Sequence, residues 1–211
     1  MKQEVYRNTS VSVKIMRSYI EKLAIDLKKK MAEVDKNVIV EFEDKGDFEM
    51  RLKLGGDVII FLMHTNVFDF EDAHVMWNTG YVKEEPYRAY CGMISIYNFL
   101  SDSFRYNREN DLGYLIARMF VNKDNHFFVE GKKQLGFMYN DFAQQKVTRD
   151  LIADVVDSAI LYSMDFDLLT PPYRHVMEIS VNEVNAVSHA ARMKTGKRLG
   201  FRFQSESETK A

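Results

Sequence analysis

The fold is decided by residues 38–64, VIVEFEDKGDFEMRLKLGGDVIIFLMH. In the middle of this stretch, over residues 48–54, apolar and polar side chains alternate strictly, which is typical of a strand with one buried and one solvated face. Tight turns at residues 44–47 and at Gly55-Gly56 separate this strand from apolar stretches on either side. The sequence therefore predicts a three-stranded antiparallel meander, because connections this short join antiparallel neighbours.

Helical periodicity brackets this sheet. Apolar residues recur at three- and four-residue steps over residues 12–34 and again over residues 148–164, where Thr148 is a suitable N-cap. A third helix is expected from Ser180 to Gly196, because the S-x-x-E sequence that begins at Ser180 has the form of a capping box. Further strands are expected over residues 87–99, 112–121 and 126–130.

Strands grouped between helices predict an α+β protein. We expect a mostly antiparallel sheet of about six strands, with one long N-terminal helix and two C-terminal helices packed on it. Residues 58–64 are apolar on both faces of the strand they form, so this strand should be central. We expect a single α+β domain over residues 1–203, followed by a polar mobile tail over residues 204–211.

Charge and hydropathy limit the partners that this chain can have. Its 211 residues contain 29 Lys and Arg against 31 Asp and Glu, for a net charge of −2, so no nucleic-acid partner is expected. No apolar stretch has the length of a membrane span, and the first ten residues are polar, so we expect no membrane association and a cytoplasmic location. The single cysteine, Cys91, is expected to be a buried thiol.

The standard motifs for phosphate binding and nucleophilic catalysis are absent from the sequence. The ten glycines form neither G-x-G-x-x-G nor a Walker-type loop, and no G-x-S-x-G nucleophile elbow is present. No cofactor is therefore expected. Whether the protein is an enzyme stays open, and these absences favour a protein without catalytic activity.

Residues 66–90 are the segment most informative for function, because they lack periodicity and are rich in aromatic side chains. Such a segment can enclose an apolar ligand or simply fill a core. Arg118 and Glu130 are ionisable residues in otherwise apolar strands, and their hairpin could bring them together, either in this pocket or as an ion pair on the wet face. The candidate pocket residues are Phe68, Phe70, Trp77, Tyr81, Tyr87, Tyr90, Tyr97, Arg118 and Glu130.

A metal site is the alternative reading of the same region. Histidines and carboxylates at a strand end and in the loop that follows can converge on one ion. The candidate ligands are His64, Asp69, Glu71, Asp72 and His74. Their spacing matches no standard ligand box, so solvated acids and ordinary hydrogen-bonded histidines are the favoured explanation.

Our leading functional hypothesis is a non-catalytic binding or interaction module that holds a small apolar or aromatic ligand, or a protein partner. The competing hypotheses are a small metal-assisted enzyme that uses the loop from His64 to His74, and a structural subunit of a larger assembly. The broad apolar stripe of the first helix could pack on its own sheet or on a second copy of the chain, so a homodimer is a further expectation.

Overall fold

The computed structural model describes residues 1–109, 111–165, 177–178, 180–182 and 184–185. Met1–Asp165 form one compact unit, and residues 166–211 are grouped as a second unit. Within the second unit, the amide of Val184 donates to the carbonyl of Ser180 (2.9 Å), a spacing typical of a helix. Residues 181–182 and 184–185 are helical, whereas residues 186–196 of the predicted third helix, the domain boundary at residue 203 and the predicted tail lie outside the described residues.

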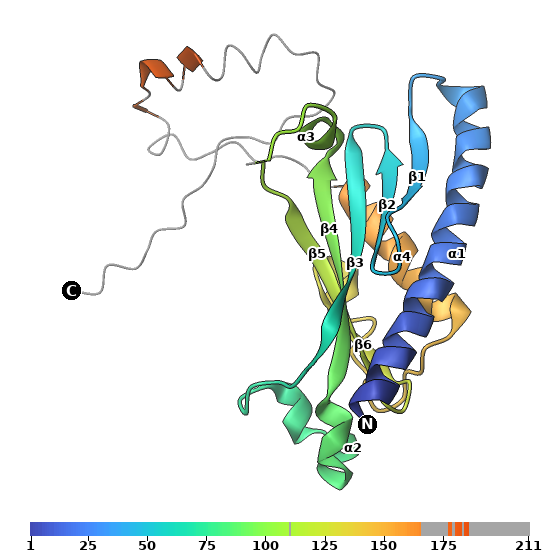
Figure 1. Ribbon diagram of the computed structural model, residues 1–211, viewed down its shortest axis with the longest axis vertical. Coiled ribbons are helices and arrows are strands. Elements are labelled where there is room, and N and C mark those ends of the chain that lie inside the picture. Colours follow the sequence, from blue (N-terminus) through green and yellow to red (C-terminus); the bar gives the residue numbers. More distant parts are fainter. Residues whose placement is uncertain (110, 166–176, 179, 183, 186–211) are drawn as a thin grey trace. The chain divides into compact units, whose positions relative to one another are not determined.

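A six-stranded antiparallel sheet forms the centre of the first unit (Figure 1). Its strands are adjacent in the order in which they occur along the chain, so each connection joins neighbours. The predicted meander is confirmed, and Gly55 takes a positive φ of 59° in its second turn. The strands are β1 (Val40–Asp44), β2 (Glu49–Leu54), β3 (Asp57–Phe68), β4 (Cys91–Leu100), β5 (Tyr114–Asn122) and β6 (Phe127–Gly131).

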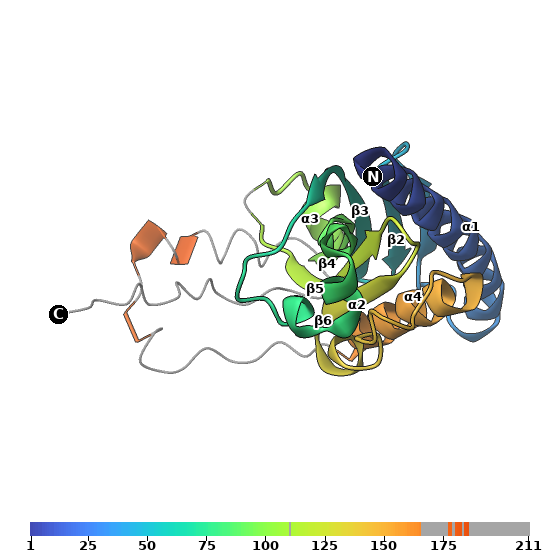
Figure 2. The same ribbon diagram turned by 90° about the horizontal axis from the view of Figure 1, so that it is seen from below.

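Two helices, α1 (Lys2–Val34) and α4 (Arg149–Met164), cover one face of this sheet (Figure 2). They bury the main hydrophobic core, whose fully buried members include Met16, Phe61 and Ile96. The hydroxyl of Tyr19 on α1 donates to both carboxylate oxygens of Asp157 on α4 (2.7 and 2.8 Å), which fixes the two helices to each other. None of the helices in the described part of the chain has an apolar stretch long enough to cross a membrane.

The start of α1 differs from the sequence prediction by ten residues, because the buried positions of its first turns are small or polar. Val5 and Thr9 are fully buried, and the hydroxyl of Thr9 donates to the carbonyl of Val5 (2.8 Å). Thr9 packs directly on Gly92 of β4, where a Cβ atom would overlap the threonine side chain. The missing side chain at this position therefore lets α1 approach the sheet closely.

Within Met1–Asp165, the opposite face of the sheet, which we call the open face, is covered only at one end. There, residues 69–90 fold into three short helices that pack against Phe120 and Phe128. The predicted strand from residue 87 begins instead at Cys91, because Pro86 starts one of these helices. The short helices are η1 (Val75–Asn78), α2 (Gly80–Glu84) and η2 (Pro86–Ala89).

The chain that follows β6 covers the outer edge of that strand. The amide of Phe127 donates to the carbonyl of Gln145 (3.0 Å), and the amide of Val129 donates to the carbonyl of Tyr139 (2.8 Å). The other edge strand of the sheet is β1, which is five residues long. Residues 139–145 therefore satisfy backbone groups that an edge strand would otherwise present to other chains.

Replacing Gly92 by alanine should destabilise the protein, because the new Cβ would force α1 away from β4. We expect the free energy of unfolding to fall by about 1–3 kcal/mol, the usual cost of overpacking. Urea unfolding measures it, with Gly80→Ala as the control, since no atom lies within 4 Å of a Cβ at Gly80. Equal stability of the two variants would contradict the close contact between Thr9 and Gly92.

Candidate functional site

The aromatic segment of residues 69–90 packs as a second hydrophobic cluster on the open face. Val82, Ala89 and Cys91 are fully buried in it. The ring of Phe70 contacts those of Phe120 and Phe128, at centroid distances of 5.0 and 5.7 Å. In the described structure, the rings at the centre of this segment are therefore held by one another and by the sheet.

The thiol of Cys91 lies inside this cluster, as expected from the sequence. It is fully buried, and burial raises the pKa of the thiol well above its ordinary value. A thiol in this environment stays protonated and acts as a small apolar side chain.

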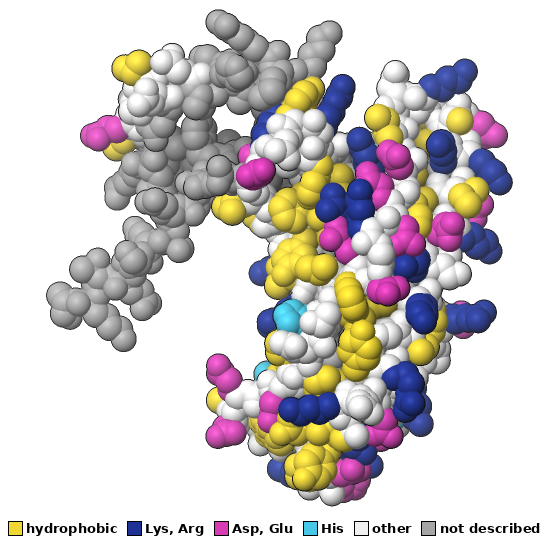
Figure 3. All heavy atoms as spheres, viewed as in Figure 1, with side chains coloured by type: hydrophobic (Ala, Val, Ile, Leu, Met, Phe, Trp, Pro, Cys, Tyr) yellow, Lys and Arg dark blue, Asp and Glu magenta, His cyan; other side chains and the backbone are white. Residues whose placement is uncertain are grey.

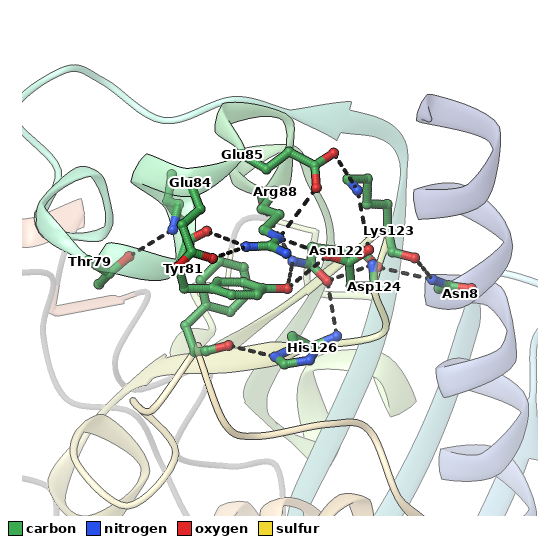
Figure 4. A network of polar contacts seen from close by, with 12 residues as sticks. Asn8, Thr79, Tyr81, Glu84, Glu85, Arg88, Asn122, Lys123, Asp124 and His126 are labelled. Carbon is green, nitrogen blue, oxygen red and sulfur yellow. Dashed lines mark hydrogen bonds and ion pairs between the residues drawn. The ribbon is translucent and has the colours of Figure 1, made fainter.

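A polar network fastens residues 79–88 to the turn between β5 and β6 (Figure 4). The hydroxyl of Tyr81 donates to Asp124 Oδ2 (3.1 Å), and Arg88 Nε donates to the same oxygen (3.0 Å). The fully buried Asn122 donates to the hydroxyl of Tyr81 and to the carbonyl of Arg88 (3.1 and 3.2 Å). From α1, Asn8 donates to the carbonyls of residues 122 and 123. The network thus joins three parts of the chain that are distant in sequence.

The protonation states of the network agree with a structural role. Burial raises the pKa of Tyr81 to about 12, so its hydroxyl remains a donor. Burial alone would raise the pKa of Asp124, but hydrogen bonds from Lys123, Tyr81 and Arg88 outweigh it and lower that pKa. Asp124 is therefore a carboxylate whose charge is compensated by its neighbours, and Tyr81 and Arg88 are both bonded to it.

The remaining predicted pocket residues do not gather around one cavity. Arg118 and Glu130 are register partners on β5 and β6 and form an ion pair, so their predicted proximity is confirmed. Phe68 at the end of β3 contacts the ring of His64, with centroids 4.7 Å apart. Tyr87 is 60% exposed. The other residues of the prediction are Trp77 in the second cluster, Tyr90 beside Tyr87, and Tyr97 in the cleft described below.

Four of the five predicted metal ligands have separate hydrogen-bond partners. His64 Nδ1 accepts from the amide of residue 66, and Asp69 Oδ1 accepts from the amide of residue 70. His74 caps η1 through Nδ1, and its Nε2 lies 3.2 Å from Glu130. Glu71 accepts the indole N–H of Trp77 through its backbone carbonyl. Among residues 1–109 and 111–165, no group of three or more His, Cys, Asp or Glu side chains is arranged to hold a metal ion.

A cleft of about 440 Å³ lies at the uncovered end of the open face. Strands β2, β3 and β4 form its floor, and the short helix α3 (Ser101–Arg105) with the loop after it forms its wall. Figure 3 shows hydrophobic side chains gathered over the strands below α3, with basic and acidic side chains beside them. The lining residues are Glu49, Arg51, Ile60, Leu62, Tyr97, Phe99, Ser103, Phe104, Asn107, Arg108, Glu109 and Asp111.

Aromatic contacts shape the wall of this cleft. The ring of Phe104 meets that of Phe99 edge to face, with centroids 5.4 Å apart. The guanidinium of Arg51 lies 4.6 Å from the centroid of Phe104, and its Nε donates to Glu49. Leu62 and Phe104 are 39% and 40% exposed, so apolar surface on both sides of the cleft is open to a ligand.

Polar groups gather where the loop after α3 closes the cleft. The hydroxyl of Ser103 donates to Asp111 (2.7 Å), and Arg108 Nη1 lies 3.7 Å from the same carboxylate. The Nε and Nη2 atoms of Arg108 are buried, and neither has a hydrogen-bond partner among the described residues. Arg108 therefore has two donor atoms at the edge of an apolar cleft that no described residue uses, and leaving buried donors unpaired costs stability.

No family model matches this chain, and no curated protein or solved structure is significantly similar to it. The geometry and chemistry of the cleft are therefore the basis on which a function can be proposed. Of the cleft residues, the sequence analysis named only Tyr97 as a candidate. One feature of the sequence did indicate this cleft. Residues on both faces of β3 are apolar, so the second face of this strand must either be buried or bind a ligand.

The network around Asp124 should make stability depend on pH. Folding lowers the pKa of Asp124 below its ordinary 3.8. The stability that the ionised carboxylate contributes is therefore complete above pH 3.8 and is lost as the pH falls through the folded pKa. We expect Asp124→Asn to reduce the free energy of unfolding at about pH 7, and the difference from the wild type to shrink at about pH 3.

Urea unfolding at both pH values measures this difference. The matched control is Asp26→Asn on the exposed side of α1, which should change stability little at either pH. A difference between wild type and Asp124→Asn that stays constant across this range would contradict the role given to the Asp124 carboxylate.

Proposed function

We propose that the protein is a non-catalytic binding module that holds a small apolar or aromatic molecule in the cleft on the open face. The observation that carries this proposal is the cleft itself, at about 440 Å³. Small-molecule sites usually occupy about 300–1,000 Å³ and have mostly apolar walls with a few polar groups. Ile60 and Leu62 supply an apolar floor, and Phe99 and Phe104 supply aromatic walls.

The charges of the cleft favour a ligand without a strong net charge. Two positive residues, Arg51 and Arg108, line it against three negative ones, Glu49, Glu109 and Asp111, so the balance is 2 − 3 = −1. Arg51 is paired with Glu49, while Arg108 has the donors that no described residue uses. A neutral acceptor, such as a carbonyl or hydroxyl oxygen on a ring, would satisfy Arg108 without adding negative charge to a site that is already negative.

The apolar surface supplies most of the expected affinity. Transfer of apolar surface out of water contributes about 25 cal/mol per Å². The side chains of Leu62 and Phe104 are exposed in the free protein, so a ligand between them would remove apolar surface from water on both of its faces. The Arg108 donors would then fix the orientation of the ligand rather than its affinity.

Filling the cleft with a larger side chain should abolish ligand binding. We expect uncharged aromatic and aliphatic metabolites to include compounds that raise the melting temperature, since a ligand at about 100 times its Kd stabilises the native state by about 2.7 kcal/mol. Leu62→Trp should remove that shift, because the indole would occupy the cleft. Leu161→Trp is the matched control, since Leu161 is 60% exposed on α4, away from the cleft.

The thermal-shift screen is followed by calorimetric titration of each hit into the wild type and both variants. Binding that Leu62→Trp leaves unchanged would overturn the assignment of the cleft. Light scattering of the same samples tests a different occupant. A dimer that dissociates in Leu62→Trp but not in Leu161→Trp would show that a second copy, rather than a small molecule, covers the open face.

A further inference from the structure

A second cleft, of about 320 Å³, lies between α1 and the turn that joins β1 to β2. Residues of α1 form one side of it, and Asp47 and Phe48 form the other. Phe48 lies two residues before the core residue Met50, and side chains two residues apart on a strand point to the same face. This cleft therefore opens on the helix-covered side of the sheet. It is therefore separate from the cleft on the open face.

Three cations on α1 converge on this second cleft. Arg7, Lys14 and Arg17 all line it, and their spacing of seven and then three residues places them along one side of the helix. Asp47 is the one acidic residue of the lining, so the balance is 3 − 1 = +2. This positive charge contrasts with the net charge of −2 of the whole chain.

The partners of these cations differ in a way that points to a ligand. Arg17 is anchored to the β1–β2 turn, because its Nη1 lies 3.2 Å from Asp44 and its Nη2 donates to the carbonyl of Gly46. Its remaining donor, Nε, is buried without a hydrogen-bond partner among the described residues. The side chains of Arg7 and Lys14 form no hydrogen bond or ion pair with any residue that the structure describes. Two positive side chains that are not paired with any described residue therefore lie beside an arginine that is anchored to the turn.

The remaining lining groups add a hydroxyl and two aromatic rings. Among the described residues, the Ser10 hydroxyl has only the Met63 sulfur as acceptor, at 3.9 Å, which is a weak bond that a better acceptor would replace. Tyr6 and Phe48 line the cleft and are 39% and 37% exposed, so each offers ring surface to a ligand. A planar apolar group can pack on such rings.

We propose that this second cleft binds a small aromatic phosphomonoester. A phosphate monoester carries a charge of about −1.5 to −2 at neutral pH and three strong acceptor oxygens. That charge matches the two cations that no described residue pairs, Arg7 and Lys14, whereas a carboxylate would neutralise only one of them. The oxygens match the donors of Arg7, Lys14 and Ser10, and the aromatic part of the ligand would pack on Tyr6 and Phe48.

Calorimetric titration with phenyl phosphate tests this proposal, with phenol and inorganic phosphate as the two partial probes. We expect phenyl phosphate to bind more tightly than either, because each partial probe satisfies half of the site. The double variant Arg7→Gln/Lys14→Gln should weaken phenyl phosphate binding by about tenfold or more, since it removes two charge-assisted contacts. Both residues are exposed, so the variant should remain folded.

The matched control is Lys22→Gln/Lys29→Gln, which removes the same charge from α1 at residues outside the cleft lining. It should change phenyl phosphate affinity less than about twofold, the scale of screened long-range attraction. Equal weakening by both double variants, or no saturable binding of phenyl phosphate, would overturn the site. Inorganic phosphate that binds as tightly as phenyl phosphate would overturn the aromatic half of the assignment. Much tighter binding of a single-stranded oligonucleotide would overturn the small-molecule assignment.

Discussion

The central strands of the sheet carry apolar side chains on both faces. Burial of both faces is therefore the constraint that shapes the rest of the structure. On one side, α1 and α4 cover the sheet. On the other side, the cover that Met1–Asp165 itself supplies is residues 69–90, which reach only Phe120 and Phe128. Ile60 and its neighbours at the opposite end are left facing a cleft. Incomplete burial of a two-sided apolar sheet therefore creates the candidate site.

Local patterns predicted those parts of the fold that depend on neighbouring residues. Strict alternation over β2 and the N-cap at Thr148 needed only a few adjacent positions, and both are confirmed. The start of α1 could not be predicted in this way. Its first buried positions include Thr9 and Ser12, whose burial depends on the close approach to β4 at Gly92. That approach joins residues more than eighty positions apart.

The candidate site was less predictable than the fold for the same physical reason. The sequence shows that residues 66–90 are rich in aromatic rings. Whether such rings line a cavity or pack in a core depends on the residues that they contact. Phe70 meets Phe120 and Phe128, which come from distant strands. Phe104 lies among polar residues in the sequence, and it forms a wall of the cleft only through its contact with Phe99. The second cleft forms because the β1–β2 turn lies beside the cations of α1, and no local pattern within α1 could predict that neighbour.

The two edges of the sheet have a consequence for how this chain behaves at high concentration. Edge strands are where one protein recruits another into a shared intermolecular sheet, the first step toward fibrils. Residues 139–145 occupy the edge at β6, and β1 is short and carries Glu41, Glu43 and Asp44. Backbone-mediated polymerisation is therefore disfavoured at both ends, by occupied hydrogen-bonding groups at one and by charge repulsion at the other.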